Sequence, residues 1–178
     1  MGMNSMLIQT AKRKRFNIIQ GKASIEKMID KLPTQDECFK FFSKGGFSSI
    51  CFILFIAQRT KINQLNVSTF AIGKKEMKSL NLLHKQGRID KADFMIGTIA
   101  KKEGSELLNV VTNVCKENGW NLRFLRNHSK VLLFDTDAGK FVIETSSNLN
   151  ENPQIEQFSF EKDTELYNFY KTNLFDNN

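Results

Sequence analysis

From residue 49 onward, short apolar segments rich in β-branched and aromatic residues alternate with segments whose apolar residues recur at helical spacing. This alternation predicts an α/β fold, because strands that are separated by helices pair mainly in parallel and are covered on both faces. The expected strands are 49–58, 64–72, 92–100, 121–126, 130–135, 140–145 and 158–160. The expected helices are 75–85, 105–117 and 164–173. We therefore expect an α/β sandwich with a mixed, mostly parallel sheet that is flanked by helices.

The first of these strands is predicted from the longest apolar run, 49–58 (SICFILFIAQ). A continuous apolar run of this length is typical of a strand that is buried on both faces. The run is too short to span a bilayer, so we expect no stable membrane insertion. Farther along the chain, the residues TDAG at 136–139 predict the turn of a β-hairpin.

The residues before the first predicted strand follow a different pattern. Residues 1–20 are polar and basic, whereas 23–32 predict a short amphipathic helix and 36–43 predict a further helical turn. We therefore expect an N-terminal basic and helical extension over 1–48 and a main α/β domain over 49–178.

The chain is basic, with 26 Lys and Arg residues against 19 Asp and Glu residues and a formal net charge of +7. This charge favours a polyanionic partner, nucleic acid first and an anionic membrane surface second. The densest basic cluster is Lys12, Arg13, Lys14 and Arg15. It is either a nucleic-acid-binding arm that contacts phosphates or a solvated leader before the fold begins.

The three cysteines, Cys38, Cys51 and Cys115, form no CxxC or Cys/His pattern, so the sequence predicts neither a disulfide framework nor a metal site. Cys51 and Cys115 occupy apolar positions that are typical of core residues. An odd number of cysteines without a disulfide pattern fits a reducing cytosol. The N-terminus also has no apolar stretch of signal-peptide length. We therefore expect a cytoplasmic protein.

The two histidines differ in their surroundings: His84 lies on a predicted helix and is expected at the surface, whereas His128 precedes an apolar strand. Strand alternation places His128 and Lys130 on one face, and Ser146 and Asn148 share a face after the next strand. The hairpin would thus bring an imidazole, an ammonium, a hydroxyl and a carboxamide to one sheet edge. The ammonium and the carboxamide can donate to phosphate oxygens, and an imidazole can act as a nucleophile or as a proton donor.

The run 128–157 (HSKVLLFDTDAGKFVIETSSNLNENPQIEQ) contains an HxKxxxxD pattern, a later Ser-x-Asn and a following Glu. In this order and spacing it resembles the signature of the phospholipase D-like phosphodiesterase superfamily. The matching residues are His128, Lys130, Asp135, Ser146, Asn148 and Glu156. The match covers about 121–157, whereas 49–120 agree with the family only in α/β order. Two features depart from the signature: the turn at 136–139 lengthens the connection, and Thr145 stands where a Gly usually precedes the Ser.

The resemblance implies a homodimer, because the family has two such motifs in each active site and this chain has one. In size and motif number the chain is similar to the one-motif bacterial Nuc-type endonucleases, in which two subunits share an active site. The family scheme implies that His128 of one subunit attacks phosphorus to form a phosphohistidine, while His128 of the other protonates the leaving oxygen. It uses no metal and no other cofactor.

The same resemblance implies the roles of the remaining residues. Lys130 and Asn148 would neutralise charge on the phosphoryl oxygens, and Ser146 would donate a further hydrogen bond. Glu156 would orient an imidazole by fixing its tautomer. Asp135 would be a structural support, because strand alternation separates it from the catalytic pair.

These expectations favour a nuclease that hydrolyses DNA or RNA. A lipid headgroup enzyme fits less well, because we find no exposed apolar or amphipathic element that the predicted core does not use. One alternative is a non-catalytic nucleic-acid-binding module with the same fold, whose binding would be sensitive to salt. Another is an interaction protein in which the His-x-Lys pair is part of a polar hairpin without a chemical role.

Overall fold

In a computed structural model of the protein, the residues described are 12–19, 25–97, 105–151 and 153–177. Their strands form one sheet in the order β1-β2-β8-β7-β6-β3-β4-β5. The strands are β1 (Arg13–Ile19), β2 (Glu37–Lys44), β3 (Ile62–Thr69), β4 (Ile89–Gly97), β5 (Asn121–Leu125), β6 (Val131–Thr136), β7 (Gly139–Thr145) and β8 (Ile155–Lys162). The helices are the 3-10 turn η1 (Ile25–Lys27), α1 (Ile50–Arg59), α2 (Lys74–Lys85), α3 (Glu106–Glu117), α4 (Thr164–Tyr170) and the π-helical segment η3 (Lys171–Asp176).

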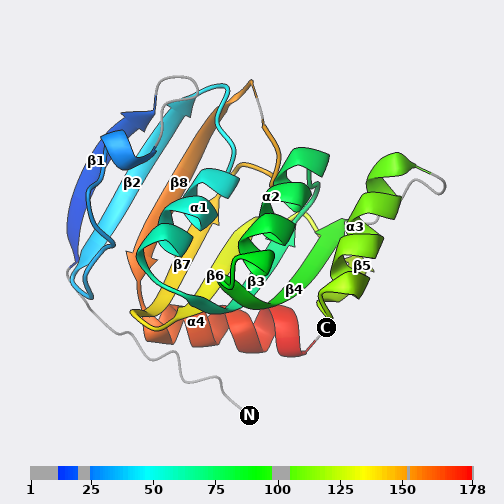
Figure 1. Cartoon of the computed structure of the whole chain (residues 1–178). Coiled ribbons are helices and arrows are strands. Elements are labelled where there is room, and N and C mark those ends of the chain that lie inside the picture. Colours follow the sequence, from blue (N-terminus) through cyan, green and yellow to red (C-terminus); the bar gives the residue numbers. More distant parts are fainter. Residues whose placement is uncertain (1–11, 20–24, 98–104, 152, 178) are drawn as a thin grey trace, which may run out of the picture.

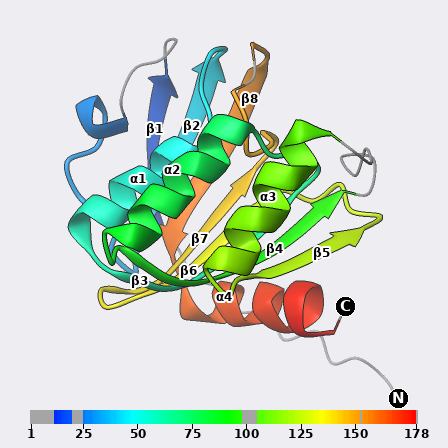
Figure 2. The same cartoon turned by 45° about the vertical axis from the view of Figure 1, so that its right-hand side comes forward.

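The sheet is mixed, as expected, but it is not mostly parallel, because four of the seven pairs between its described strands are antiparallel. Strands β3, β4 and β5 pair in parallel, as do β1 and β2, whereas β6, β7 and β8 join them through antiparallel pairs. Helices α1, α2 and α3 cover one face of the sheet, and Figure 2 shows α4 against the other face. The result is a three-layer α/β arrangement (Figure 1).

The main core lies between the sheet and helices α1, α2 and α3, and phenylalanine rings fill much of it. The ring of Phe52 on α1 lies 5.4 Å from the ring of Phe41, 5.7 Å from that of Phe47 and 5.3 Å from that of Phe158, measured between ring centroids. The pairs with Phe41 and Phe47 are edge-to-face, and such pairs add to the free energy that burial of apolar area supplies. A smaller cluster packs α4 and η3 against the opposite face through Tyr167 and Phe175.

The prediction of a strand over 49–58 is wrong, because these residues form helix α1. The helix packs against the sheet and η1, and it buries residues around most of its circumference, from Ile50 and Phe52 to Ile56 and Ala57. A helix that is buried on most sides has the same continuous apolar pattern as a strand covered on both faces.

The two predictions for the N-terminal region also need correction. The predicted helical turn over 36–43 is strand β2, and of the predicted helix over 23–32 only η1 is helical, with 23–24 outside the described residues. Strand β2 is held by β1 on one side and by β8 on the other, so distant pairing decides its structure. Strands β1 and β2 of the expected extension are therefore part of the same sheet as the main domain.

The other predicted elements are confirmed, within a few residues at their ends. Strand β8 is longer than the predicted 158–160, and helix α4 continues as η3 beyond the predicted end at 173. The last part of the predicted strand 92–100 lies outside the described residues. The hairpin turn over 136–139 is confirmed between β6 and β7. In the described part of the chain, no helix combines the length and the apolar character needed to cross a membrane.

Candidate active site

Five strands meet at one end of the sheet, which we call the site edge: β2, β3 and β7 end there, and β6 and β8 begin there. The register fixes this arrangement, because Ser68 of β3 lies opposite Val131 of β6, and Ser43 of β2 lies opposite Glu156 of β8. Helices α1 and α2 also begin at this edge, since each follows a strand that ends there (Figure 1). Strand ends beside helix N-termini are a common place for anionic ligands in α/β proteins.

The predicted pair of His128 and Lys130 lies at this edge. His128 is exposed in the segment between β5 and β6. Nζ of Lys130 lies 3.3 Å from Nδ1 of His128 and donates a hydrogen bond of 2.8 Å to the backbone carbonyl of His128. An imidazole and an ammonium group are therefore in contact at a surface that a ligand can reach.

The two neighbours of His128 fasten its backbone to the sheet. Nδ2 of Asn127 donates to Oγ of Ser68 at 2.9 Å and to the carbonyl oxygen of Met95 at 3.1 Å. Oδ1 of Asn127 accepts from the backbone N–H and the hydroxyl of Ser129, at 2.9 and 2.7 Å. Asn127 thus ties the segment to β3 and β4, and the position of the imidazole follows from these bonds.

An aromatic ring packs beside the imidazole. The ring centroid of Phe70, just after β3, lies 5.0 Å from that of His128. Gly97 allows this packing, because a Cβ at Gly97 would lie 2.8 Å from the ring and the carbonyl oxygen of Phe70 and 3.0 Å from the carbonyl oxygen of Asn127. Sequence analysis missed Phe70 and Gly97. Their place at the ends of predicted parallel strands is the signal that could have identified them.

Glu156 connects the second part of the motif to the first. It is buried at the start of β8 and accepts a hydrogen bond from Oγ of Ser146. Partial burial lowers the pKa of Lys130, and the negative charge of Glu156 opposes this effect. The predicted residues therefore form two bonded pairs, His128 with Lys130 and Ser146 with Glu156, and the charge of Glu156 acts on Lys130.

Three buried polar atoms at the same edge have no hydrogen-bond partner in the described part of the chain. They are Oγ of Ser43 and Oδ1 of both Asn148 and Asn150. Asn148, the remaining residue of the predicted Ser-x-Asn pair, accepts hydrogen bonds at its backbone oxygen from Ser49 and Ser147. Buried polar groups are normally paired with protein or water, so unpaired ones gathered at one edge indicate a place for a polar ligand or for water.

Asp135 lies far from this group. It is near the other end of β6, five residues after Lys130, and it pairs in register with Lys140 of β7. At about 3.4 Å per residue, this puts it roughly 17 Å from the site. Burial of the phenol raises the pKa of Tyr167 on α4, and the charge of Asp135 adds to this effect. Its surroundings are those of the sheet face that α4 covers.

The basic cluster at the start of β1 is largely paired with carboxylates. Lys12 bonds Glu161 at 2.6 Å and also Asp163, and these bonds outweigh its burial, so that its pKa is raised. Arg13 bonds Asp36 at 2.6 Å. Because β1 runs parallel to β2, the cluster lies at the opposite end of the sheet from His128. Any contact of the cluster with nucleic acid would therefore lie the length of a strand away from His128.

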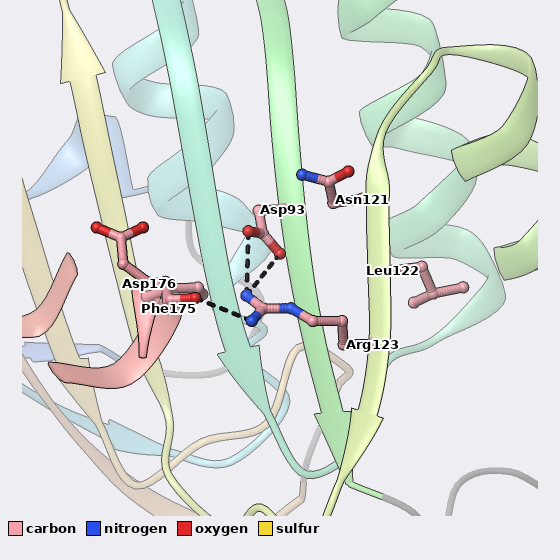
Figure 3. Close-up of a pocket in the computed structure, with 6 residues that line it drawn as sticks. All are labelled: Asp93, Asn121, Leu122, Arg123, Phe175 and Asp176. Carbon is pink, nitrogen blue, oxygen red and sulfur yellow. Dashed lines mark hydrogen bonds and ion pairs between the residues drawn. The ribbon is translucent and has the colours of Figure 1, made fainter. Parts of the chain in front are cut away.

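A cavity of about 420 Å³ lies beside β4 and β5 (Figure 3). Arg123 reaches across it to both carboxylate oxygens of Asp93 at 3.1 Å and to the carbonyl oxygen of Phe175 at 2.9 Å. These bonds hold η3 against the sheet, so the cavity is part of a structural clamp. In the residues that the structure describes, no three His, Cys, Asp or Glu side chains are grouped so that they could hold a metal ion.

Comparison with known proteins gives a match in structure only. No protein-family model matches the sequence, and no curated protein matches it. The fold is similar to that of polyphosphate kinase from Porphyromonas gingivalis, with a TM-score of 0.59 and 10% identity over 85% of this chain and 29% of that chain. Yeast tyrosyl-DNA phosphodiesterase is a weaker match, with a TM-score of 0.38 and 12% identity over 56% of this chain and 25% of that chain.

The chain therefore spans less than a third of the length of the solved structures that it matches. At 10% identity, the similarity to the polyphosphate kinase concerns the fold and not the chemistry. The mixed eight-stranded sheet, the helices on both of its faces and this match together show that the chain has the phospholipase D-like α/β fold.

Proposed function

We propose that the protein is a phosphodiesterase that hydrolyses DNA or RNA in a homodimer, through a phosphohistidine intermediate and without a metal ion. The observation that supports this proposal is the pair of His128 and Lys130 in contact at one sheet edge, with the bonded pair of Ser146 and Glu156 at the same edge. A nucleophile beside a cationic donor, with further donors around it, is what phosphoryl transfer requires. The phospholipase D-like fold and the basic charge of the chain agree with it.

In the proposed reaction, the imidazole of His128 attacks phosphorus, a P–N bond forms, and the bond between phosphorus and the leaving oxygen breaks. His128 of a second copy gives its proton to that oxygen. Water then attacks phosphorus, the P–N bond breaks, and the proton of the water returns to the second imidazole. Lys130 stabilises the negative charge of the phosphoryl oxygens, because its ammonium already lies 3.3 Å from the attacking ring.

The homodimer follows from the number of imidazoles that this reaction needs. One ring must act as nucleophile while another acts as acid, and the chain offers one histidine, His128, at the site. The other histidine, His84, lies on α2, where Nδ1 is 2.9 Å from the carbonyl oxygen of Ile89 and the ring packs against Trp120. The exposure of His128 at the sheet edge would let a second copy approach it.

The decisive experiment compares wild type with His128→Ala on bis(p-nitrophenyl) phosphate, plasmid DNA, single-stranded DNA and RNA, all with EDTA present. His84→Asn is the matched control, because an asparagine amide can keep the hydrogen bond to the carbonyl of Ile89. We expect hydrolysis by wild type and His84→Asn, none by His128→Ala, and the same dimeric mass for all three in sedimentation. Unchanged hydrolysis by His128→Ala would overturn the assignment.

The intermediate can be tested separately. Rapid acid-free quenching with a ³²P-labelled diester should trap label on wild-type protein, and the label should be lost in acid and kept in alkali, as expected for a P–N bond. Salt-sensitive binding of nucleic acid without any turnover would instead favour a binding module with the same fold.

A further inference from the structure

Among the described residues, no helix covers the sheet face opposite α1 over β1, β2 and β8; we call this part the open face. Helix α4 and η3 cover the same side of the sheet only farther along, over β6, β7 and β4, as Figure 1 shows. Large apolar side chains are exposed on the open face: Phe16 is 75% exposed, Ile18 59%, Phe42 56% and Ile155 71%. The expectation that the core would use every apolar element is therefore wrong for these four residues. Exposed apolar groups that gather on one face usually mark a binding surface.

Basic side chains alternate with the aromatic ones on this face. Lys14 is two residues before Phe16 on β1, and Lys40 is two residues before Phe42 on β2, so strand alternation puts all four side chains on one side. Together with Ser159 and Gln157 of β8, they line a groove of about 680 Å³. Nζ of Lys40 donates to Oγ of Ser159 at 2.8 Å, which fixes the ammonium over the floor of the groove.

We propose that this groove binds single-stranded nucleic acid and leads it to His128. Cleavage of the bound strand rests on the proposed function. Binding of the strand in the groove does not depend on it. Aromatic rings provide stacking platforms for bases, lysines neutralise phosphates, and Gln157 and Ser159 can hydrogen-bond base edges. Phe16 and Phe42 stand on neighbouring strands two register positions apart, since Phe42 lies opposite Ile18. This puts the two residues about 8 Å apart. Two successive bases could stack on both only if the strand is extended well beyond the 3.4 Å rise of a duplex.

The groove and the candidate active site adjoin each other where β7 and β8 pair. Gln157 lines the groove, and its backbone N–H donates to Oγ of Ser146 at 3.0 Å. In return, the backbone N–H of Ser146 donates to the carbonyl oxygen of Gln157 at 3.1 Å. Glu156, which bonds Ser146, is the next residue along β8. Strand alternation points Gln157 into the groove and Glu156 to the opposite face, so a strand that leaves the groove over Gln157 would pass around the ends of β7 and β8 to reach the site.

Charge and polarity distinguish this occupant from two others. A second copy seated on the same face would bring Lys14 and Lys40 of two chains together, and like charges repel. A lipid surface would bury Asn17, Gln157 and Ser159, which line the groove, among acyl chains that offer them no hydrogen bonds. An extended anionic strand with aromatic bases satisfies both the lysines and the polar groups, and the one acidic side chain of the lining, Glu144, already accepts a hydrogen bond from the hydroxyl of Tyr170.

The test measures binding of dye-labelled oligothymidylate by fluorescence anisotropy to full-length His128→Ala, which prevents cleavage during the titration. We expect preference for the single strand over a duplex of equal length. In that background, Phe16→Ala and Phe42→Ala should each weaken binding by about tenfold. Lys14→Ala should lower the slope of log affinity against log salt by about 0.7. Leu82→Ala and Lys85→Ala, both exposed on α2, are the matched controls and should change little.

The proposal would be overturned if Phe16→Ala and Phe42→Ala bind oligothymidylate as tightly as the His128→Ala parent. It would also be overturned if the parent binds the duplex as tightly as the single strand. The proposal would also be overturned if oligothymidylate does not bind and the protein instead self-associates or binds phosphatidylserine vesicles, with that binding lost in the same variants. Failure of the proposed function is distinct from these outcomes. It would appear as sequence-tolerant binding in the groove with no hydrolysis of any diester by wild type.

Discussion

The ammonium of Lys130 lies 3.3 Å from Nδ1 of His128 and 2.8 Å from the carbonyl oxygen of the same residue. A lysine ammonium has only donors, so in this contact Nδ1 acts as the acceptor. In a neutral imidazole the ring proton is then on Nε2. A phosphate oxygen is a stronger acceptor for Lys130 than either atom of His128, so substrate would draw the ammonium away and leave Nδ1 available for a proton.

The first prediction concerns that ammonium. Lys130→Met keeps the length of the side chain and removes its charge, and we expect kcat for diester hydrolysis to fall by roughly 10²- to 10³-fold. Lys85→Met, at an exposed site on α2, is the control. Steady-state kinetics on bis(p-nitrophenyl) phosphate measure the effect. A Lys130→Met enzyme within threefold of wild type would rule out a role for Lys130 in the transition state.

The second prediction concerns pH. Burial lowers the pKa of Lys130 and the charge of Glu156 raises it, so Glu156→Gln removes the raising contribution. The pKa of Lys130 should fall further, and the basic limb of the kcat/KM profile should move to lower pH. The pH dependence of acetylation of Lys130 by acetic anhydride, followed by mass spectrometry, gives the same pKa independently of activity. A basic limb and an acetylation curve that stay in place would contradict the coupling.

The parts of the fold that could be predicted from sequence are those decided by local patterns. Helix α3 and strand β3 have clear periodicities, and both were confirmed. Helix α1 was mistaken for a strand because burial on most sides removes the periodicity that separates the two. Strand β2 was missed because its pairing with β8 joins residues that are over 100 positions apart in the chain. Local propensity carries no information about such a partner.

The site divides in the same way. His128 and Lys130 are two residues apart, so the motif and strand alternation were enough to bring them together. Phe70 and Gly97 lie close to His128 only because of the order of strands in the sheet, which a single sequence does not specify. The open face with Phe16 was missed for a related reason, because only the placement of α4 decides which part of the sheet stays uncovered.

The third prediction concerns Asn127 as a positioning residue. Asn127→Ala removes its bonds to Ser68, Met95 and Ser129, and we expect kcat to fall by about tenfold or more while KM changes little. The free energy of unfolding should fall by only about 1–3 kcal/mol. Asn127→Asp can still accept from Ser129 and should recover part of kcat. Asn63→Ala, at a surface bond to Asp137, is the control. A loss of stability without a loss of kcat would make Asn127 merely structural.

The last prediction concerns acid stability. Glu37 on β2 accepts a hydrogen bond from the backbone N–H of Thr34 and pairs with Lys31, and these bonds outweigh burial and lower its pKa from 4.5 to about 2. Arg15 also forms an ion pair with Glu37. Because the folded pKa lies below the unfolded one, Glu37 stabilises the fold above pH 4.5, and this contribution is lost as pH falls toward 2.

At pH 7, Glu37→Gln should reduce the free energy of unfolding by roughly 1 to 3 kcal/mol, since the two cationic partners are half exposed. Urea unfolding of both proteins at pH 7, 4 and 2.5 should show the difference shrink with acid, whereas exposed Glu117→Gln on α3 should show no such trend. A difference that persists unchanged at pH 2.5 would mean that Glu37 contributes through packing and not through its charge.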